Sequence, residues 1–327
     1  MTTHASFANS MTEPLVSVIV PIYNGEADLP ELLRCLEAQT YPRDRAEYWL
    51  VDNNSRDRTR ELIQAASRAA ADQGWTLNYL CEDQIQSSYA ARNRGICAAN
   101  GDWLAFTDAD CRPQPDWLEQ LVQPLGDPAV GLSVGEITAL PGSTIWERHA
   151  EREATLSQKH TLANTFCPYG QTANLAVKRQ ALEQVGLFRP YLTTGGDADL
   201  CWRVQREGGW QLRFVEAAQV QHRHRATLDE LRSQWRRYGR SSRYLHDLHG
   251  TPLMREPSPR EYLRQSARWL LKESPKTLLK AIAGQATLAD LLGTPIGLIC
   301  VQARTEGQRQ AVLPAEARMI PPLEPRP

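Results

Sequence analysis

The sequence predicts an α/β fold with a mostly parallel sheet flanked by helices, followed by an appended helical C-terminal region. Apolar runs rich in β-branched residues alternate with amphipathic segments through the first part of the chain. This alternation is typical of β-α-β units and a parallel sheet. Beyond about residue 245 the pattern changes to helical segments separated by proline. The 327 residues suffice for one large or two modest domains with a substantial core.

The elements follow from the hydrophobic pattern in chain order. Strands are expected at residues 15–20, 48–51, 75–81, 103–107, 130–137 and 211–220. Helices are expected at residues 28–39, 57–71, 89–99, 115–122, 143–165, 199–207, 258–272 and 275–292.

The chain is predicted to divide into four segments. Residues 1–13 are small and polar, without the apolar core of a signal peptide, and are expected to form a flexible tail. Residues 14–245 carry the α/β pattern, and residues 246–313 carry the helical region. Residues 314–327 are rich in proline and are expected to be disordered.

Basic residues are concentrated in one part of the chain, although the net charge is only −1. Residues 203–273 hold 15 Arg and Lys against 8 Asp and Glu. A basic face suits an anionic partner, but a solvated helical face explains the same pattern. Together with apolar patches at residues 291–292 and 296–301, it permits peripheral contact with an anionic membrane. Packing of these helices on the α/β domain is the alternative, and no nucleic-acid partner is predicted.

The cysteines and the apolar segments bear on localisation. Seven cysteines are scattered without a Cys-x-x-Cys pair, which is typical of reduced thiols in the cytosol. The uncharged apolar stretch at residues 291–303 is shorter than the roughly 20 residues that a membrane-spanning helix needs. The sequence therefore predicts a cytoplasmic protein that could contact the inner face of the membrane peripherally.

Acidic residues follow three of the predicted elements. Asp52 ends the second strand, Asp108 and Asp110 follow the fourth, and Asp197 and Asp199 lie at the start of a helix. The first two sites are expected at one edge of the sheet, since ligands bind outside the carboxyl ends of parallel strands. Two carboxylates on alternate residues can hold Mg²⁺ or Mn²⁺, which prefer oxygen ligands. Capping of the next helix would explain one of these carboxylates but not both.

Five motifs follow one another in the first 245 residues. They are Val16-Ser-Val-Ile-Val-Pro-Ile-Tyr-Asn24, Val51-Asp-Asn-Asn-Ser-Arg-Asp57, Ala91-Arg-Asn-Arg-Gly95, Asp108-Ala-Asp110 and Gly196-Asp-Ala-Asp-Leu-Cys-Trp-Arg203. In this order they resemble glycosyltransferase family 2 over about residues 14–245. The resemblance implies a GT-A (Rossmann-like) fold, a nucleotide-diphosphate sugar donor, a divalent cation (Mn²⁺ or Mg²⁺) and inversion at the anomeric carbon.

By this resemblance, the nucleotide end of the donor would meet residues after the first two strands. Pro21, Tyr23 and Asn24 would lie at the base and ribose, and a plain Asn-Gly turn is the alternative. Asp52 would accept a hydrogen bond from the base or the ribose, with an Asx-turn or a cap of the next helix as the alternative. Arg92 would pair with the diphosphate or with a carboxylate of the site, and a surface ion pair is the alternative.

The resemblance also implies roles in metal binding and catalysis. Asp110 would bind the cation, with Asp108 at the ribose or the water shell of the metal. His222, at the end of a strand, would complete the metal shell, and a structural role is the equal alternative. Asp197 aligns with the catalytic base of the family, although Gly196 stands where the family usually has Glu.

Three residues after the base are expected to support the site or the acceptor. Asp199 would brace the site or cap its helix. Trp202 would face the acceptor or lie in the core, and the core is preferred. Arg203 extends the resemblance. Residues 234–238 loosely match the Gln-x-x-Arg-Trp of membrane-bound processive synthases, and in this chain the modest interpretation is a basic helix near the diphosphate.

The predicted function is therefore an inverting glycosyltransferase that moves a sugar, from UDP by preference, to a saccharide or lipid-linked acceptor hydroxyl. Cell-envelope, polysaccharide or glycolipid synthesis would suit such an enzyme. A nucleotidyltransferase is disfavoured because residues 21–26, after the first strand, contain no basic residue. A non-catalytic binding module is disfavoured because Asp108, Asp110 and Asp197 are all present. The sequence names neither the sugar nor the acceptor.

Overall fold

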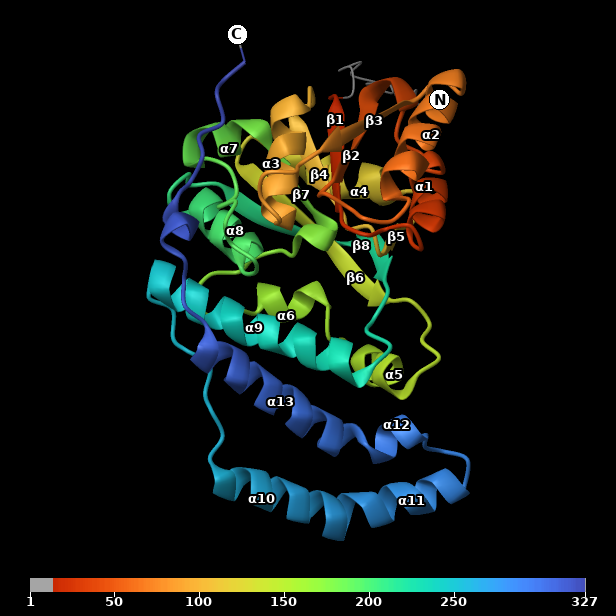
Figure 1. The fold of residues 1–327 in the computed structure, drawn as a ribbon, viewed down its shortest axis with the longest axis vertical. Coiled ribbons are helices and arrows are strands. Elements are labelled where there is room, and N and C mark those ends of the chain that lie inside the picture. Colours follow the sequence, from red (N-terminus) through yellow and green to blue (C-terminus); the bar gives the residue numbers. More distant parts are fainter. Residues whose placement is uncertain (1–13, 327) are drawn as a thin grey trace, which may run out of the picture.

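The computed structural model describes residues 14–326, so the tail expected at residues 1–13 lies outside the described part. An eight-stranded sheet with helices on both faces forms the upper part of the molecule, and a layered set of helices lies below it (Figure 1). The prediction of an α/β fold with a C-terminal helical region is confirmed.

The sheet is mixed, with strand order β3-β2-β1-β4-β7-β6-β8-β5. Its four parallel strands β3, β2, β1 and β4 are neighbours, and β6 and β8 form a further parallel pair. Strand β7 runs antiparallel between β4 and β6, and β5 runs antiparallel to the end of β8. The strands are β1 (Val16–Ile22), β2 (Ala46–Asp52), β3 (Thr76–Cys81), β4 (Trp103–Phe106), β5 (Cys111–Pro113), β6 (Val130–Ala139), β7 (Leu175–Lys178) and β8 (Gln211–His222).

Two apolar layers hold the sheet in place. Helices α1 (Leu29–Glu37), α2 (Thr59–Asp72) and α4 (Trp117–Val122) bury their apolar faces on one side. Helices α3 (Ser88–Ala98), α7 (Arg179–Val185) and α8 (Gly196–Arg206) bury theirs on the other side. Because both faces are covered, all seven residues of β1 are buried, as its continuous apolar run predicts.

The remaining helices lie below the sheet. They are α5 (Ile145–Arg152), α6 (Gln158–Leu162), α9 (Leu228–His249), α10 (Pro259–Arg268), α11 (Ser274–Ile282), α12 (Leu288–Leu291) and α13 (Gly293–Gln310). Helices α9 and α13 pack side by side, and α10 and α11 form the outermost layer (Figure 1). No helix in residues 14–326 is long and apolar enough to cross a membrane.

The apolar stretch of residues 291–303 becomes part of α13 and packs inward. Ile296 and Cys300 are buried against Leu231 of α9. Helices α9 and α13 approach so closely that a Cβ atom at Gly239 would lie 1.9 Å from the carbonyl oxygen of Arg304. Much of this stretch therefore packs on the rest of the protein, which was the alternative to membrane contact.

The segment after residue 313, expected to be disordered, instead packs along the α7 and α8 side of the molecule. Ala317 and Leu323 are buried there, and the amide of Leu187 donates to the carbonyl oxygen of Pro321 at 2.9 Å. Proline suits an extended strap, because such a segment needs few backbone donors of its own. Its few apolar side chains provide the anchoring that overall composition does not reveal.

Candidate functional site

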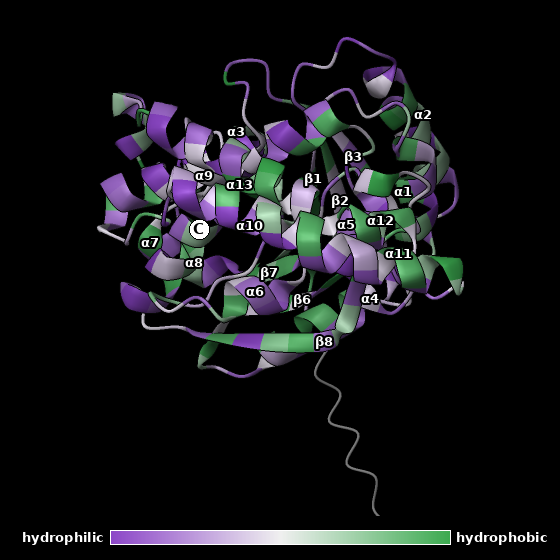
Figure 2. Ribbon diagram, turned by 90° about the horizontal axis from the view of Figure 1, so that it is seen from below, coloured by the Kyte–Doolittle hydropathy of each residue, from purple (hydrophilic) through white to green (hydrophobic). Residues whose placement is uncertain are grey.

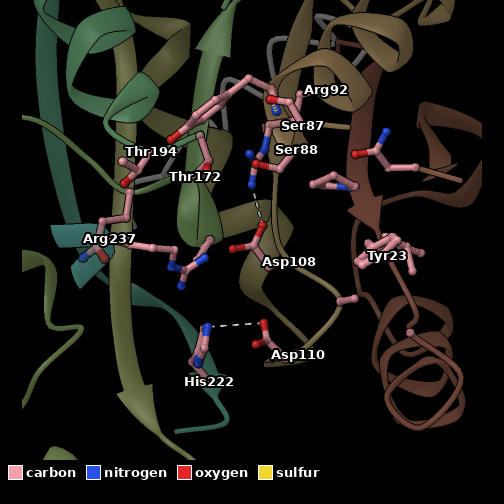
Figure 3. A pocket seen from close by; sticks show the side chains of 18 of the residues that line it. Tyr23, Ser87, Ser88, Arg92, Asp108, Asp110, Thr172, Thr194, His222 and Arg237 are labelled. Atoms are coloured by element: carbon pink, nitrogen blue, oxygen red, sulfur yellow. Dashed lines mark hydrogen bonds and ion pairs between the residues drawn. The ribbon is translucent and has the colours of Figure 1, made fainter. Parts of the chain in front are cut away.

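A cavity of about 600 Å³ opens at the carboxyl ends of β1 and β4, between the sheet and α9 (Figure 3). This is the edge at which open α/β sheets bind ligands. The predicted site residues that line it are Pro21, Tyr23, Asn24, Arg92, Asp108, Asp110, Asp197 and His222. The predicted residues outside its lining are Asp52, Asp199, Trp202 and Arg203.

The loop after β1 is held by the loop after β2. The amide of Asn24 donates to Oγ of Ser55 at 2.9 Å, and its side-chain oxygen accepts from the amide of Arg56 at 2.9 Å. Asn24 has a left-handed φ of 50°, as an Asn-Gly turn requires. This anchoring leaves the exposed ring of Tyr23 at the cavity (Figure 3).

Asp52 is buried behind this loop. Its carboxylate accepts from the amide of Ser55 at 2.9 Å and from the hydroxyl of Tyr79 at 3.4 Å. The first contact goes to the amide three residues on, one residue further than in an Asx-turn, and it gives Asp52 a structural role within its own loop. Its neighbour Asn53, which was not predicted, lines the cavity and donates from Nδ2 to the carbonyl oxygens of Glu82 and Ile85.

Arg92 is fixed by the first carboxylate of the Asp-Ala-Asp motif. Its Nη2 lies 2.5 Å from Oδ1 of Asp108, and its side chain is only 3% exposed (Figure 3). The guanidinium also lies 5.7 Å from the ring centre of Tyr89, a cation–π contact. Of the two partners considered for Arg92, the structure has the carboxylate of the site.

The short strand β5 explains why Asp110 meets His222. Antiparallel pairing places Cys111 opposite His222, and the amide of Arg223 donates to the carbonyl oxygen of Asp110 at 3.1 Å. Nε2 of His222 then lies 3.2 Å from Oδ1 of Asp110 (Figure 3). Residues 112 positions apart in the sequence thus become neighbours through a three-residue strand.

The donor atoms of Asp110 and His222 fit a divalent cation. Nδ1 of His222 lies 2.7 Å from the carbonyl oxygen of Arg223. A ring held at Nδ1 in this way directs Nε2 toward Asp110, where it can bind a metal or share a proton. The thiol of Cys111 lies within the same cluster. Burial raises its pKa well above the ordinary thiol value, and the charges of Asp108 and Asp110 raise it further.

Asp197 lies in the first turn of α8, which begins after Gly195 in a left-handed conformation. Its Oδ1 accepts from the hydroxyl of Thr172 at 2.9 Å. Burial raises the pKa of Asp197, while the charge of Arg92 and the hydrogen bond from Thr172 oppose the rise. A carboxylate with a raised pKa is a stronger base than an exposed one, which suits proton abstraction.

The ring of Tyr89 explains the glycine at position 196. The amide of Gly196 donates to the hydroxyl of Tyr89 at 3.0 Å, and a Cβ atom at this position would lie 2.7 Å from Cζ of the ring. The ring is stacked on Phe188 and cannot retreat freely. Any larger residue at position 196, the Glu usual in the family included, would collide with Tyr89 in this arrangement.

Asp199, Trp202 and Arg203 form the support of α8. Asp199 is fully buried between Nε of Arg189 at 2.9 Å, Arg203 at 3.0 Å and Nε2 of His249 at 2.9 Å. Burial alone would raise its pKa, but the hydrogen bond from His249 and the two arginines lower it to about 2. Trp202 is buried, and its ring nitrogen donates to the carbonyl oxygen of Cys167 at 2.7 Å.

Several cavity residues were not predicted individually. Arg225 lies 3.7 Å from Oδ2 of Asp110, and Arg237 of α9 has no ion-pair or hydrogen-bond partner within residues 14–326. Both belong to the basic region noted in the sequence, and Arg237 lies in the Gln-Trp-Arg-Arg-Tyr segment. Thr172 and Thr194 also line the cavity (Figure 3), and no motif or periodicity distinguishes them in the sequence.

Comparison with known families agrees with this geometry. The sequence profile described as Glycosyl transferase family 2 matches residues 17–186, and that of Glycosyl transferase family group 2 matches residues 103–294. The chain belongs to glycosyltransferase family 2. This family membership makes the protein a glycosyltransferase, as the motif order predicts.

Similar proteins are found among both curated sequences and solved structures. Glycosyltransferase AglE of Haloferax volcanii is 35% identical over 69% of this chain and 72% of its own length. An undecaprenyl-phosphate 4-deoxy-4-formamido-L-arabinose transferase of Pseudomonas aeruginosa is 36% identical over 57% of this chain and 56% of its own length. A mannosyltransferase of Pyrobaculum calidifontis, solved with GDP-Man and Mn²⁺, shares the fold with a TM-score of 0.58. That structure is 22% identical and aligns over 91% of this chain and 85% of its own.

Proposed function

We propose that this family 2 enzyme is an inverting glycosyltransferase that moves a sugar from a nucleoside diphosphate to an acceptor hydroxyl. One observation carries the proposal: Asp110 and His222, whose side chains lie 3.2 Å apart, share a single cavity with Asp197. Asp108 and Arg92 lie in the same cavity. The loop that holds Tyr23 and Asn24 would receive the nucleotide at the other side of the cavity.

Asp110 and His222 would hold the divalent cation, with Asp108 close by. When bound, the cation supplies positive charge against the negative charge that grows on the departing diphosphate. Because His222 contributes an imidazole nitrogen, the pair suits Mn²⁺ better than Mg²⁺. The proposal of Mn²⁺ agrees with its presence in the similar mannosyltransferase structure.

The side chains of the cavity would act in a single displacement. Asp197 accepts the proton of the acceptor hydroxyl while the oxygen of that hydroxyl bonds to the anomeric carbon. The bond from that carbon to the diphosphate oxygen breaks on the opposite face, so the configuration inverts. Arg225 and Arg237 are placed to neutralise the leaving diphosphate. Arg92 instead fixes Asp108 and limits how far the pKa of Asp197 rises.

The donor and acceptor classes follow from the family resemblance and from one curated relative. A UDP-sugar is preferred as the donor, in keeping with the family resemblance. The Pseudomonas relative is named for transfer involving undecaprenyl phosphate, which supports a lipid-linked or saccharide acceptor in envelope glycoconjugate synthesis. Work in the cytoplasm, at or near the inner face of the membrane, would suit that role.

Separating donor binding from transfer tests the proposal. Nucleotide sugars are screened by thermal shift with and without Mn²⁺, and transfer is then measured with the donor that binds. Asp110→Ala should lose the Mn²⁺-dependent part of the shift. Asp197→Asn should keep that shift but lose at least about 100-fold in transfer, as expected when a general base is removed. Asp72→Asn, an exposed carboxylate on α2, is the control for both.

The outcomes distinguish the alternatives. Full transfer by Asp197→Asn would refute the assignment of the base, and an unchanged Mn²⁺ response of Asp110→Ala would refute the metal site. A nucleotidyltransferase would consume a nucleoside triphosphate instead of a nucleotide sugar. A non-catalytic module would bind the donor in the wild type without any transfer.

A further inference from the structure

The outermost layer of the molecule exposes six large apolar side chains. Helix α10, the turn at Trp269–Glu273 and α11 run end to end at the lower edge in Figure 1. Their exposed apolar side chains are between 52% and 78% accessible: Leu263, Leu270, Leu271, Leu278, Leu279 and Ile282. Exposed apolar residues are ordinary when scattered, but a contiguous patch of this kind marks an interaction site.

The spacing of these residues places them on one side of the helical layer. Leu263 and Leu270 are seven residues apart, as are Leu271 and Leu278, so both pairs lie after two helical turns on the same face. The opposite face is the one attached to the protein. There the ring nitrogen of Trp269 donates to the carbonyl oxygen of Leu291 at 2.8 Å, and Glu273 accepts from Thr294 at 2.7 Å.

A stripe of basic residues runs beside the apolar one. Every fourth residue from 260 to 280 is basic: Arg260, Arg264, Arg268, Lys272, Lys276 and Lys280. Residues four apart share a helix face, so these side chains form one row. The acidic residues of the segment are Glu261 and Glu273, which pair with Arg255 and Arg268. The other five basic side chains of the row have no acidic partner within residues 14–326.

We propose that this face of α10 and α11 binds the surface of an anionic lipid bilayer. A helix with leucines on one side and Lys and Arg beside them lies in the membrane interface, with the leucines among the acyl chains and the basic groups at lipid phosphates. A second copy of the chain would bring two basic rows together, and their repulsion disfavours that occupant. Figure 2 views the molecule from below, and the ribbons of this layer carry both hydrophobic and hydrophilic residues.

The proposed membrane-binding face of α10 and α11 differs from the apolar patches at residues 291–292 and 296–301 that the sequence indicates. Of the apolar residues 296–301, Ile296 and Cys300 are buried against α9. Helix α13 thereby lies between the outer layer and α9 (Figure 1). Since α9 provides Gln234, Arg237 and Tyr238 to the cavity wall, a bilayer under α10 and α11 would lie on the cavity side of the sheet. The binding itself does not depend on the proposed reaction.

Co-sedimentation of the full chain with vesicles tests the proposal without any donor or metal. The wild type should pellet with vesicles that mix phosphatidylcholine and phosphatidylglycerol, should bind phosphatidylcholine vesicles far less, and should be released as salt rises. Lys276→Gln/Lys280→Gln should weaken binding to the anionic vesicles roughly 25-fold, because each lysine contributes about fivefold near an anionic surface. Leu271→Asn/Ile282→Asn should abolish pelleting.

Matched substitutions elsewhere serve as controls. Arg68→Gln/Arg94→Gln removes the same charge from exposed positions on α2 and α3 and should bind as the wild type does. Val312→Asn makes the same kind of change at an equally exposed apolar residue outside the layer. Equal binding to neutral and anionic vesicles, or unchanged binding by the lysine variant, would refute the proposal. The proposal would also be refuted if the wild type formed a dimer without lipid and Leu271→Asn/Ile282→Asn converted that dimer to a monomer. That result would assign the face to a second copy of the chain.

Discussion

At the residue scale, the chemistry of the cavity depends on how Asp197 is held. Burial raises its pKa, and Thr172 and Arg92 oppose that rise. The ordered acidic motifs point to Asp108, Asp110 and Asp197 in the sequence, and the three residues line one cavity. Thr172 could not be found in this way, because it lies in a turn before β7 and meets Asp197 only through the fold.

We predict that Thr172→Val moves the acidic limb of the transfer rate to higher pH. Only the deprotonated form of Asp197 can accept a proton, so activity falls as the pH drops through its pKa. Loss of the Thr172 hydrogen bond raises that pKa further, because the bond stabilises the charged form. The pH profile of kcat measures the shift, and the plateau at high pH should be nearly unchanged.

Thr194→Val is the control, since Thr194 lines the same cavity without a hydrogen bond to Asp197. Its pH profile should match that of the wild type. A shift of the Thr172→Val profile to lower pH, or equal shifts in both variants, would show that Asp197 is not the titrating base.

At the element scale, the sequence did not predict the short strand β5 or the close packing of α13 on α9. Strand β5 has three residues and no recognisable pattern, yet its pairing with β8 brings Asp110 to His222. The long apolar runs of β1 and β2 are local signals and were predicted. The apolar stretch that forms much of α13 was visible in the sequence, but its packing against α9 depends on glycines whose role appears only in three dimensions.

We predict that Gly307→Ala lowers the free energy of unfolding by about 1–3 kcal/mol, the usual cost of overpacking. A Cβ atom at Gly307 would lie 2.0 Å from the carbonyl oxygen of Arg236, so α13 would have to move away from α9. Gly297→Ala on the same helix meets nothing within 4 Å. This control should be neutral or more stable by up to about 1 kcal/mol, through helix propensity alone.

Urea unfolding of both variants measures the difference. Equal stability of the two variants would mean that α9 and α13 leave room for a Cβ atom at position 307, contrary to the structure. Because α9 carries Arg237 and Tyr238 to the cavity, Gly307→Ala should also weaken donor binding, whereas Gly297→Ala should not.

At the scale of the whole molecule, the chain is tied together by its last segment. Residues 314–326 return from α13 to the sheet domain, where Arg326 donates to the carbonyl oxygens of Ala99 and Gly101. Arg189 contacts both the carbonyl oxygen of Arg318 and the buried carboxylate of Asp199. The segment therefore supports the helix that carries Asp197. The proline content of residues 314–327 led to a prediction of disorder. Composition averages over a segment and does not identify the few side chains that anchor it.

We predict that Leu323→Ala lowers the free energy of unfolding by about 2–4 kcal/mol, the range for truncating a buried leucine. Leu323 is 7% exposed, whereas Met319 in the same segment is 49% exposed. Met319→Ala is therefore the matched control and should change stability by less than about 0.5 kcal/mol. If residues 314–326 were detached in solution, both substitutions would be equally harmless in urea unfolding. A loss confined to Leu323→Ala, with vesicle binding unchanged, would establish residues 314–326 as a structural part of the sheet domain, separate from the layer of α10 and α11.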